Sequence, residues 1–274
     1  MIILKNLHTK AHKQRSKSAR KSGFTLIELS IVLVIIGLIV GGVLTGQDLI
    51  KAAQVRATVS QYEGYNTAVN TFQTKYNGLP GDLIAATASQ FGLTYGAGTA
   101  GLGDGDGMIA DNSGTAGVEG GLFWVHLSAA NLIGNNFTLA TGTATDYAGA
   151  ASTAEVLPLA KITGNYFWVS SSGGLNYYGL SGVTSFLETT GPAVTSQGQL
   201  TPIQAYNIDL KIDDGAPNTG IVQAIGASVS GALTLTTAAS TISCISASGS
   251  AGTYVTNVTT VGNTPSCSLR MRFN

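Results

Sequence analysis

The order of apolar and polar positions divides the start of the chain into zones. Residues 1–23 are polar and basic, and residues 24–47 form an apolar run with a single charge, Glu28. Within this run, Leu29 to Gly46 is uncharged over 18 residues, which is long enough for a helix to cross a membrane. The basic residues precede the run, so the positive-inside rule places the N-terminus in the cytoplasm and the body on the other side.

A second helical pattern follows the apolar run without interruption. Apolar side chains recur at spacings of three, four and seven residues, which is typical of an amphipathic helix. Asn77-Gly78 and Pro80 then act as stop signals. We therefore predict one long helix, with a membrane half at 24–50 and an amphipathic half at 51–77 that packs on the protein's own sheet. The expected buried positions are Ala52, Val55, Val59, Tyr62, Val69, Phe72 and Tyr76.

Glycines recur in the membrane half of this helix, although a glycine in a helix outside lipid costs about 1 kcal/mol. One interpretation is that small residues permit close helix packing in a membrane or a filament core. The other is that this stretch unwinds when the chain leaves the bilayer. The sequence leaves both open for Gly37, Gly41, Gly42 and Gly46.

Residues 78–274 have the pattern of a β-rich body with one short helix. Glu119 to Ile133 has helical spacing, and short apolar runs elsewhere alternate with Gly, Asn and Ser turns, which is typical of strands. Ala205 to Ile212 and the turn-rich residues after it suggest a hairpin. The predicted fold class is α+β, with the long helix packed on an antiparallel sheet. The expected strands are Tyr166–Ser170, Leu175–Gly179, Ala205–Ile212, Gly220–Ala224, Ala232–Thr236, Tyr254–Val258 and Ser268–Phe273.

Composition narrows the class of protein. Charged residues make up 10% of the 274 residues, against about 25% in an average soluble domain, which suits a secreted or assembled protein. Residues 1–23 carry seven basic groups and no acid, so the remaining 251 residues hold 7 basic and 14 acidic groups, a net charge of −7. A nucleic-acid-binding body would carry a basic stripe, so we expect no nucleic-acid partner.

Glu28 is the one charge inside the apolar run. An acid within a membrane segment costs about 2.5–3.5 kcal/mol near the bilayer centre, and is by default a functional residue with a cationic partner. The alternative places Glu28 in the headgroup region. A secretory signal peptide would have small residues at a cleavage site after the run, but Gln47-Asp48-Leu49 follows. An uncleaved signal anchor is therefore the better of the two ordinary interpretations.

These features together resemble the cleavage and methylation motif of type IV prepilins and pseudopilins. The resemblance rests on Lys21-Ser22-Gly23-Phe24-Thr25-Leu26-Ile27-Glu28-Leu29, with the basic leader before it and the apolar run after it. It implies that a prepilin peptidase cleaves between Gly23 and Phe24 and N-methylates Phe24. It also implies that Glu28 pairs with the Phe24 amine of a neighbouring subunit during filament assembly.

The resemblance further implies a pilin-like fold and a structural function. It places the chain in the inner membrane as a single span with a periplasmic body, before inner-membrane machinery adds it to identical or homologous subunits in a helical filament. The expected product is a type IV pilus at the cell surface. The alternatives are a type II secretion pseudopilin and a low-copy minor pilin acting as a surface-binding module. The implied divisions are a cleaved leader at 1–23, the two helix halves and a body at 78–274.

Further motifs in the body resemble a group of large Gram-negative prepilins. The resemblance rests on Leu79-Pro80-Gly81-Asp82, the Gly/Asp loop Gly103-Asp104-Gly105-Asp106-Gly107, the helix motif Trp124-x-His126-Leu127, and Ile208-Asp209-x-Lys211-x-Asp213-Asp214-Gly215.

Two acidic clusters raise the question of a cofactor. Carboxylates that alternate with glycine offer the oxygen ligands that calcium prefers. The alternative is a solvated turn held by Asx hydrogen bonds. No cofactor is expected, with calcium kept as the alternative. The candidate ligands are Asp104, Asp106, Asp213 and Asp214, with Asp111 and Asn218 as further members.

The remaining candidates for chemistry are few. Two cysteines beyond a membrane segment fit an oxidising compartment, and the pilin resemblance implies that Cys244 and Cys267 form a disulfide around a surface loop; two free buried thiols are the alternative. His126 is the only histidine beyond residue 23, which excludes a histidine-rich metal site. A nucleophilic site needs a base with an orienting group, and none is evident, so we expect His126 to be structural and the chain not to be an enzyme.

Overall fold

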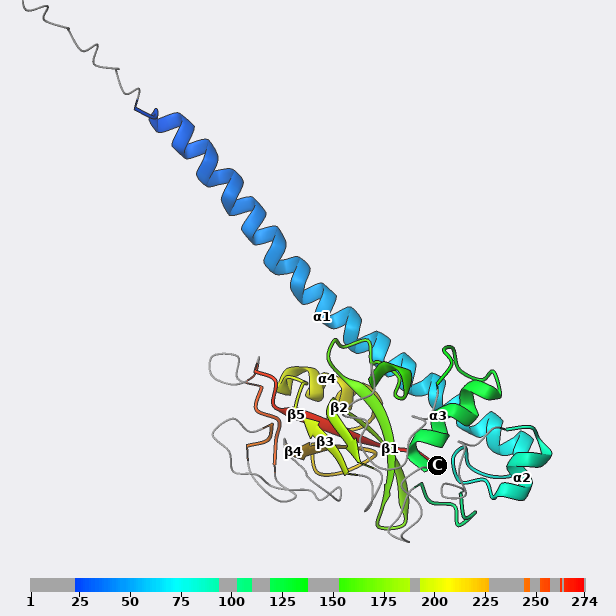
Figure 1. The fold of residues 1–274 in the computed structure, drawn as a ribbon. Helices are drawn as coiled ribbons and strands as arrows, with labels where there is room; N and C mark the ends of the chain where they lie inside the picture. The colour runs from blue at the N-terminus through cyan, green and yellow to red at the C-terminus, as the bar shows by residue number, and fades with distance from the viewer. Residues whose placement is uncertain are drawn as a thin grey trace, which may run out of the picture. The chain divides into compact units, whose positions relative to one another are not determined.

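The structure is a computed structural model, shown as a ribbon in Figure 1. Its contacts divide the chain into two compact units, Met1–Asp48 and Leu49–Asn274. Helix α1 contributes its first part to one unit and the rest to the other. The described residues are 23–93, 103–109, 119–137, 153–187, 193–226, 244–246, 252–256, 262 and 264–273.

The predicted long helix is α1 (Leu26–Tyr76), with 51 residues. It stays α-helical through the glycines of its membrane half, and a Cβ added at any of them would meet nothing within 4 Å. Within the described chain, then, nothing packs on those glycines. The helix ends where the stop signals predict. Asn77 takes a positive φ of 54°, and its N–H donates to the Gln73 carbonyl at 2.8 Å, which closes the last turn with a left-handed cap.

The second half of α1 supplies the long side of the body's core. Its buried residues recur every three or four positions, as the amphipathic pattern predicts. The prediction for Ala52 is wrong: it is exposed, because the buried face begins at Val55. The other expected positions are confirmed as buried, and the same face also buries Thr58, Tyr65 and Ala68.

An antiparallel sheet provides the other side of the core, which confirms the α+β fold class. The strand order is β1-β2-β5-β4, and β3 pairs with β2 off this path. All pairings are antiparallel. Gly173 and Gly174, both at positive φ, make the tight turn between β1 and β2. The strands are β1 (Tyr166–Ser172), β2 (Leu175–Leu187), β3 (Ala193–Gln197), β4 (Val222–Gly226) and β5 (Cys267–Phe273).

Aromatic rings join α1 to the sheet. Tyr178 of β2 is fully buried and meets Tyr62 of α1 edge-on, with 5.7 Å between ring centroids. Tyr65 meets Trp124 of helix α3 (Glu119–Ala129) at 4.9 Å. Edge-to-face pairs of this kind stabilise a core by more than the buried area of the rings alone.

The short helix predicted at 119–133 is confirmed as α3, which is four residues shorter than predicted. Helix α2 (Ala85–Gln90) is a further short helix.

The strand predicted at Ala205–Ile212 is wrong. These residues belong to helix α4 (Pro202–Ile212), so the hairpin proposed with the turn after them is also wrong. Thr201 and Gln204 form a capping box at its start, with Pro202 in the first turn, and both are helix-start signals. Apolar alternation at 208, 210 and 212 suggested a strand, but only Ile208 of these is buried and Leu210 is 52% exposed.

Other strand predictions are confirmed in part. Those over β1, β2 and β5 lie within the observed strands, and the one at 220–224 is shifted to β4. In place of a strand at 254–258, Tyr254 makes an isolated bridge to Ile245. Residues 257–258 and the strand predicted at 232–236 lie outside the described residues.

Candidate functional site

The predicted processing segment lies at the start of α1. Gly23, Phe24 and Thr25 precede the helix without regular structure, and the Phe24 side chain is 85% exposed. A peptidase that cleaves at the Gly23–Phe24 bond needs an accessible substrate chain, and both residues of that bond are exposed. Cleavage at Gly23 and methylation at Phe24 remain predictions.

Glu28 caps the helix that it belongs to. Its Oε2 accepts hydrogen bonds from the backbone N–H and the hydroxyl of Thr25, both at 2.7 Å. In return, Thr25 Oγ1 accepts from the Glu28 N–H at 3.3 Å. This reciprocal arrangement is a capping box, and the carboxylate also lies at the positive end of the helix dipole. Glu28 was among the residues predicted to act in assembly but Thr25 was not, although Thr-x-x-Glu before an apolar run is a recognised helix-start pattern.

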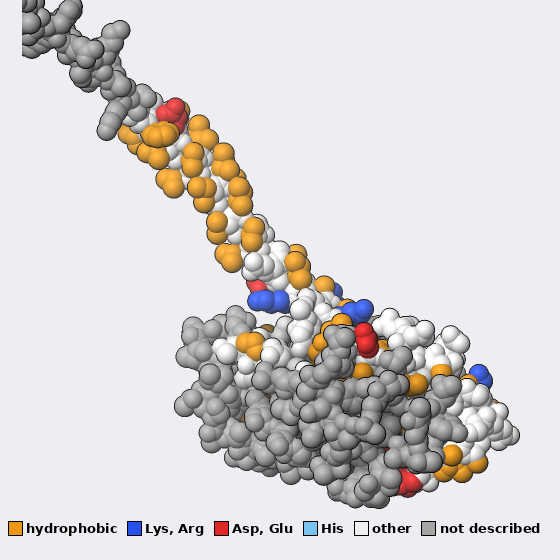
Figure 2. Space-filling view, viewed as in Figure 1, with side chains coloured by type: hydrophobic (Ala, Val, Ile, Leu, Met, Phe, Trp, Pro, Cys, Tyr) orange, Lys and Arg blue, Asp and Glu red, His pale blue; other side chains and the backbone are white. Residues whose placement is uncertain are grey.

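The rest of α1 in the first unit has an apolar surface with no core of its own. Its large side chains from Leu26 to Val40 are half to nine-tenths exposed, and Figure 2 shows them covering the visible side of this part of the helix. The helix is long and apolar enough to cross a membrane, with a mean hydropathy of 2.7 in its most apolar window. Such a surface requires lipid or another protein around it.

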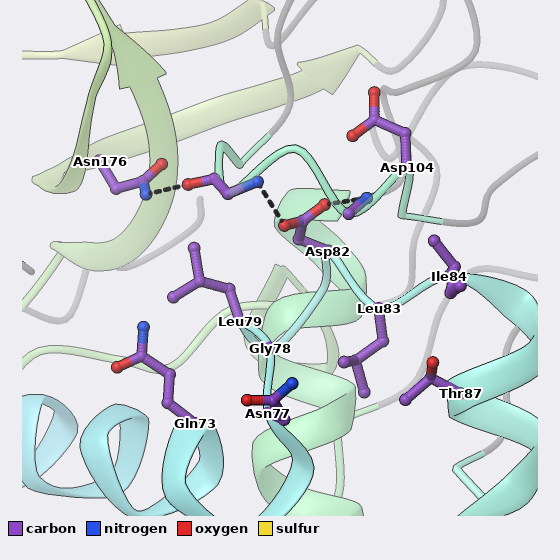
Figure 3. A pocket seen from close by; sticks show the side chains of 12 residues that line it. Gln73, Asn77, Gly78, Leu79, Asp82, Leu83, Ile84, Thr87, Asp104 and Asn176 are labelled. Atoms are coloured by element: carbon purple, nitrogen blue, oxygen red, sulfur yellow. Dashed lines mark hydrogen bonds between the residues drawn. The ribbon is translucent and has the colours of Figure 1, made fainter.

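A second candidate site lies in the body, where Asp82 joins two loops. The Asp82 side chain is buried, and its two oxygens accept from the backbone N–H groups of Gly105 at 2.7 Å and Gly107 at 2.8 Å (Figure 3). Burial raises the pKa of this carboxyl, and the two N–H donors act in the opposite direction. The Leu-Pro-Gly-Asp motif therefore holds the Gly/Asp loop in place through its last residue.

The same junction reaches the sheet. Asn176 of β2 accepts from the Ile109 N–H at 2.9 Å. It also donates to the Gly107 carbonyl at 2.8 Å (Figure 3). The loop therefore pairs with an amide side chain where it passes the end of the sheet. Together with nearby residues of α1 and α2, this junction lines a pocket at the end of α1. The lining includes Gln73, Asn77, Leu79, Asp82, Ile84 and Asp104.

His126 holds the Trp-x-His-Leu motif of α3 against the Leu-Pro-Gly-Asp motif that follows α1. Its Nδ1 accepts from the Gly81 N–H at 2.9 Å, and its ring stacks on Phe72 of α1 at 6.0 Å. Burial lowers the pKa of His126 to about 4, so the ring is neutral at physiological pH and Nδ1 can accept. Gly81 has a φ of +90°, and a Cβ there would lie 2.4 Å from the Glu119 carbonyl oxygen, which is why glycine is required. A structural His126 was predicted, and these contacts describe such a role.

The structure gathers carboxylates around the Gly/Asp loop. Asp82, Asp104 and Asp106 place one oxygen each within 4.8 Å of one another. Asp104 accepts from the Asp106 N–H at 3.0 Å, and Asp106 accepts from the Met108 N–H at 2.7 Å. These are the Asx hydrogen bonds of the turn interpretation, and both Asp82 oxygens already have donors. Calcium binding stays the untested alternative to a site without a cofactor, and Asp111 lies outside the described residues.

A second carboxylate cluster follows α4. Asp209 was not among the predicted ligands, but it lies close to the predicted Asp213 and Asp214. Its buried carboxylate accepts from the Tyr254 hydroxyl at 2.8 Å and the Gly215 N–H at 3.1 Å. Asp214 accepts from the Ala216 N–H at 2.8 Å, and Asp213 from the Ile221 N–H. These carboxylates hold the segment that leads into β4, where Asn218 also has an interaction partner.

Cys244 and Cys267 form a disulfide, which ties residues 244–246 to the first residue of β5. Cys267 is fully buried, and its backbone exchanges hydrogen bonds with Leu200 at 2.9 and 3.1 Å. Ser246 and Val255 continue a short ladder within the loop that the disulfide closes. Since the hydroxyl of Tyr254 in this loop donates to Asp209, the second carboxylate cluster and the disulfide hold the same loop in place.

Comparison with known proteins identifies the N-terminal segment. Residues 18–44 match the family model of the prokaryotic N-terminal methylation motif. The chain carries a type IV prepilin-like signal. This prepilin-like signal includes Gly23, Phe24, Thr25 and Glu28, and extends through the exposed apolar part of α1 to residue 44. No curated protein and no solved structure matches the chain.

The prepilin-like signal and the fold agree with each other. A long N-terminal helix on an antiparallel sheet is consistent with the pilin-like fold, and the signal with its apolar helix fits a membrane-anchored precursor. The signal implies processing by a prepilin peptidase and assembly with other pilin subunits, which suggests a structural subunit.

Proposed function

We propose that this chain is a structural subunit of a type IV pilus or a closely related filament. The observation that carries the proposal is the prepilin-like signal at residues 18–44. It includes the apolar part of α1 that lies in the first unit, where the large side chains are exposed. A peptidase cut between Gly23 and Phe24 leaves this helix on the mature chain, so the subunit keeps its means of assembly. The partners are the prepilin peptidase, further pilin subunits and the inner-membrane assembly machinery.

The charges at the new N-terminus support a specific mode of assembly. Cleavage creates a cationic amine on Phe24, which the peptidase then methylates, beside an apolar helix surface. Glu28 of a neighbouring subunit can neutralise that amine. Removing one partner from a buried pair of this kind leaves an uncompensated charge and costs about 3–5 kcal/mol. The pair would therefore select the axial register in which the two groups meet.

The test is to shear cells that express the chain, collect the fibres and measure the intact mass of this protein in them. The expected mass is that of residues 24–274 plus CH2 for one N-methylation and minus two hydrogens for the disulfide. Processed protein that remains in the inner membrane would instead indicate a secretion pseudopilin or a low-copy minor pilin. Full-length protein that retains residues 1–23 would contradict the proposal.

A further inference from the structure

The Glu28 carboxylate divides its two oxygens between different tasks. Oε2 takes both hydrogen bonds from Thr25, at 2.7 Å each. Oε1 accepts no hydrogen bond from the part of the chain that the structure describes. The carboxylate is thus half engaged in its own helix start, and one oxygen is left to meet a group from outside.

A second capping box in the same chain shows what capping alone requires. At the start of α4, Thr201 Oγ1 accepts from the Gln204 N–H at 3.2 Å, and Gln204 Oε1 accepts from the Thr201 N–H at 3.0 Å. A neutral amide closes this box as a carboxylate does. The capping hydrogen bonds therefore do not require a charge at position 28, whereas pairing with an external cation does.

We propose that Thr25 is a positioning residue for subunit assembly, which fixes Oε2 of Glu28 so that Oε1 faces the incoming amine. This inference rests on the proposed function. A glutamate side chain in an otherwise apolar, exposed stretch is free to rotate, and each fixed rotamer costs entropy when a contact forms. The Thr25 hydroxyl and N–H remove that freedom before the partner arrives. They also keep the charge at the positive end of the α1 dipole, where it is most favourable.

The chain offers variants that separate capping from charge. Glu28→Gln keeps the capping box, as Gln204 shows, but removes the charge. Thr25→Val keeps the charge and the side-chain size but removes the hydroxyl. Thr25→Ser is the matched control that restores the hydroxyl. Thr201→Val removes the hydroxyl of the other box, which has no part in the N-terminal segment.

Each variant is expressed as the full chain, and three quantities are measured. Intact mass gives the fraction that is cleaved and methylated. Shearing gives the fraction in fibres relative to processed protein. Hydrogen exchange of the purified, processed chain in detergent micelles reports on the Glu28 N–H, which donates to the Thr25 hydroxyl. We expect Thr25→Val to be processed normally, to exchange about fivefold faster at the Glu28 N–H, and to enter fibres several-fold less. Thr25→Ser and Thr201→Val should assemble as the parent chain does.

The outcomes distinguish this inference from the function on which it rests. If Glu28→Gln assembles normally, charge pairing fails and the proposed mode of assembly fails with it. If Glu28→Gln fails but Thr25→Val assembles normally, Thr25 has no positioning role and the proposed function stands. Loss of cleavage in Thr25→Val would overturn the inference by placing Thr25 at the peptidase step. Failure of Thr25→Ser to restore assembly would overturn it by showing that the hydroxyl is not what matters.

Discussion

At the scale of single residues, buried carboxylates hold the loops of this protein in place in a way that its apolar pattern does not show. Asp82 and Asp209 are both buried, and each accepts two hydrogen bonds from outside its own segment: Asp82 from Gly105 and Gly107, and Asp209 from Tyr254 and the Gly215 turn. Such groups fix loops that have little apolar surface of their own, because a buried carboxylate without its donors is costly. The neutral His126, bound to Gly81, works in the same way.

The buried Asp209 should make stability depend on pH. Burial, reinforced by Asp213 and Asp214, raises the pKa of Asp209 to about 6, although the hydrogen bonds from Tyr254 and Gly215 lower it. The folded chain therefore binds a proton more tightly than the unfolded chain, whose aspartates have a pKa of about 3.9. The stabilisation from protonation is complete below about pH 4 and is lost as pH rises through about 6.

An Asp209→Asn chain should lack this part of the pH dependence, because its side chain does not titrate. The measurement is the urea midpoint of the full chain in detergent from pH 4 to 7. The matched control is Asp48→Asn, an exposed carboxyl on α1, which should keep the parent profile. The assignment would be contradicted if the urea midpoint changed between pH 4 and 6 in the same way in the parent chain and in Asp209→Asn.

At the scale of elements, α1 and α4 show how context decides between similar patterns. The same helix α1 is buried on one face from Val55 to Tyr76 and exposed all round before Asp48. Its sequence distinguishes these halves well, because one has a stripe and the other has none. In α4 the apolar residues fit a strand and a helix equally, and the capping box and the contacts with the body select the helix.

The helical form of α4 predicts opposite results for two neighbouring apolar residues. Ile208 is fully buried, whereas Leu210 is 52% exposed. Ile208→Ala should therefore lower the free energy of unfolding by about 2–5 kcal/mol, and Leu210→Ala should change it by about 0.5 kcal/mol or less. Urea denaturation of the two variants measures both values. Equal losses would indicate that both side chains lie on one buried face, as in a strand.

At the scale of the whole molecule, the chain combines an assembly segment with a body that has its own core. The first unit has apolar surface and almost no internal packing, while the second unit has the sheet, the aromatic contacts and the disulfide. The stability of the body and the assembly of the helix are therefore separable properties. Changes in the body's loops should affect folding, and changes near Glu28 should affect assembly.

Removal of the disulfide should test this separation. Replacing Cys244 and Cys267 by serine should lower the free energy of unfolding by about 3 kcal/mol, since the bridge closes a loop with a sequence separation of 23 residues. Processing at Gly23 should be unchanged in that variant. Urea denaturation and intact mass measure the two properties, and a reduced parent chain is the control for the loss of stability. Loss of cleavage together with stability would mean that the two units are not independent.

Local signals along the chain were enough to predict several parts of this protein. Spacing, charge and stop signals act within a few turns of chain. They predict the prepilin-like signal, the span of α1 and its buried stripe, and the short helix α3. Strands β1, β2 and β5 follow from alternation between turns. Contacts between distant residues were needed to show that His126 binds Gly81, that Asp82 binds Gly105 and Gly107, that Asp209 binds Tyr254, and that 202–212 is a helix. Those outcomes depend on which distant donors and apolar surfaces surround each residue, and a linear pattern does not contain that information.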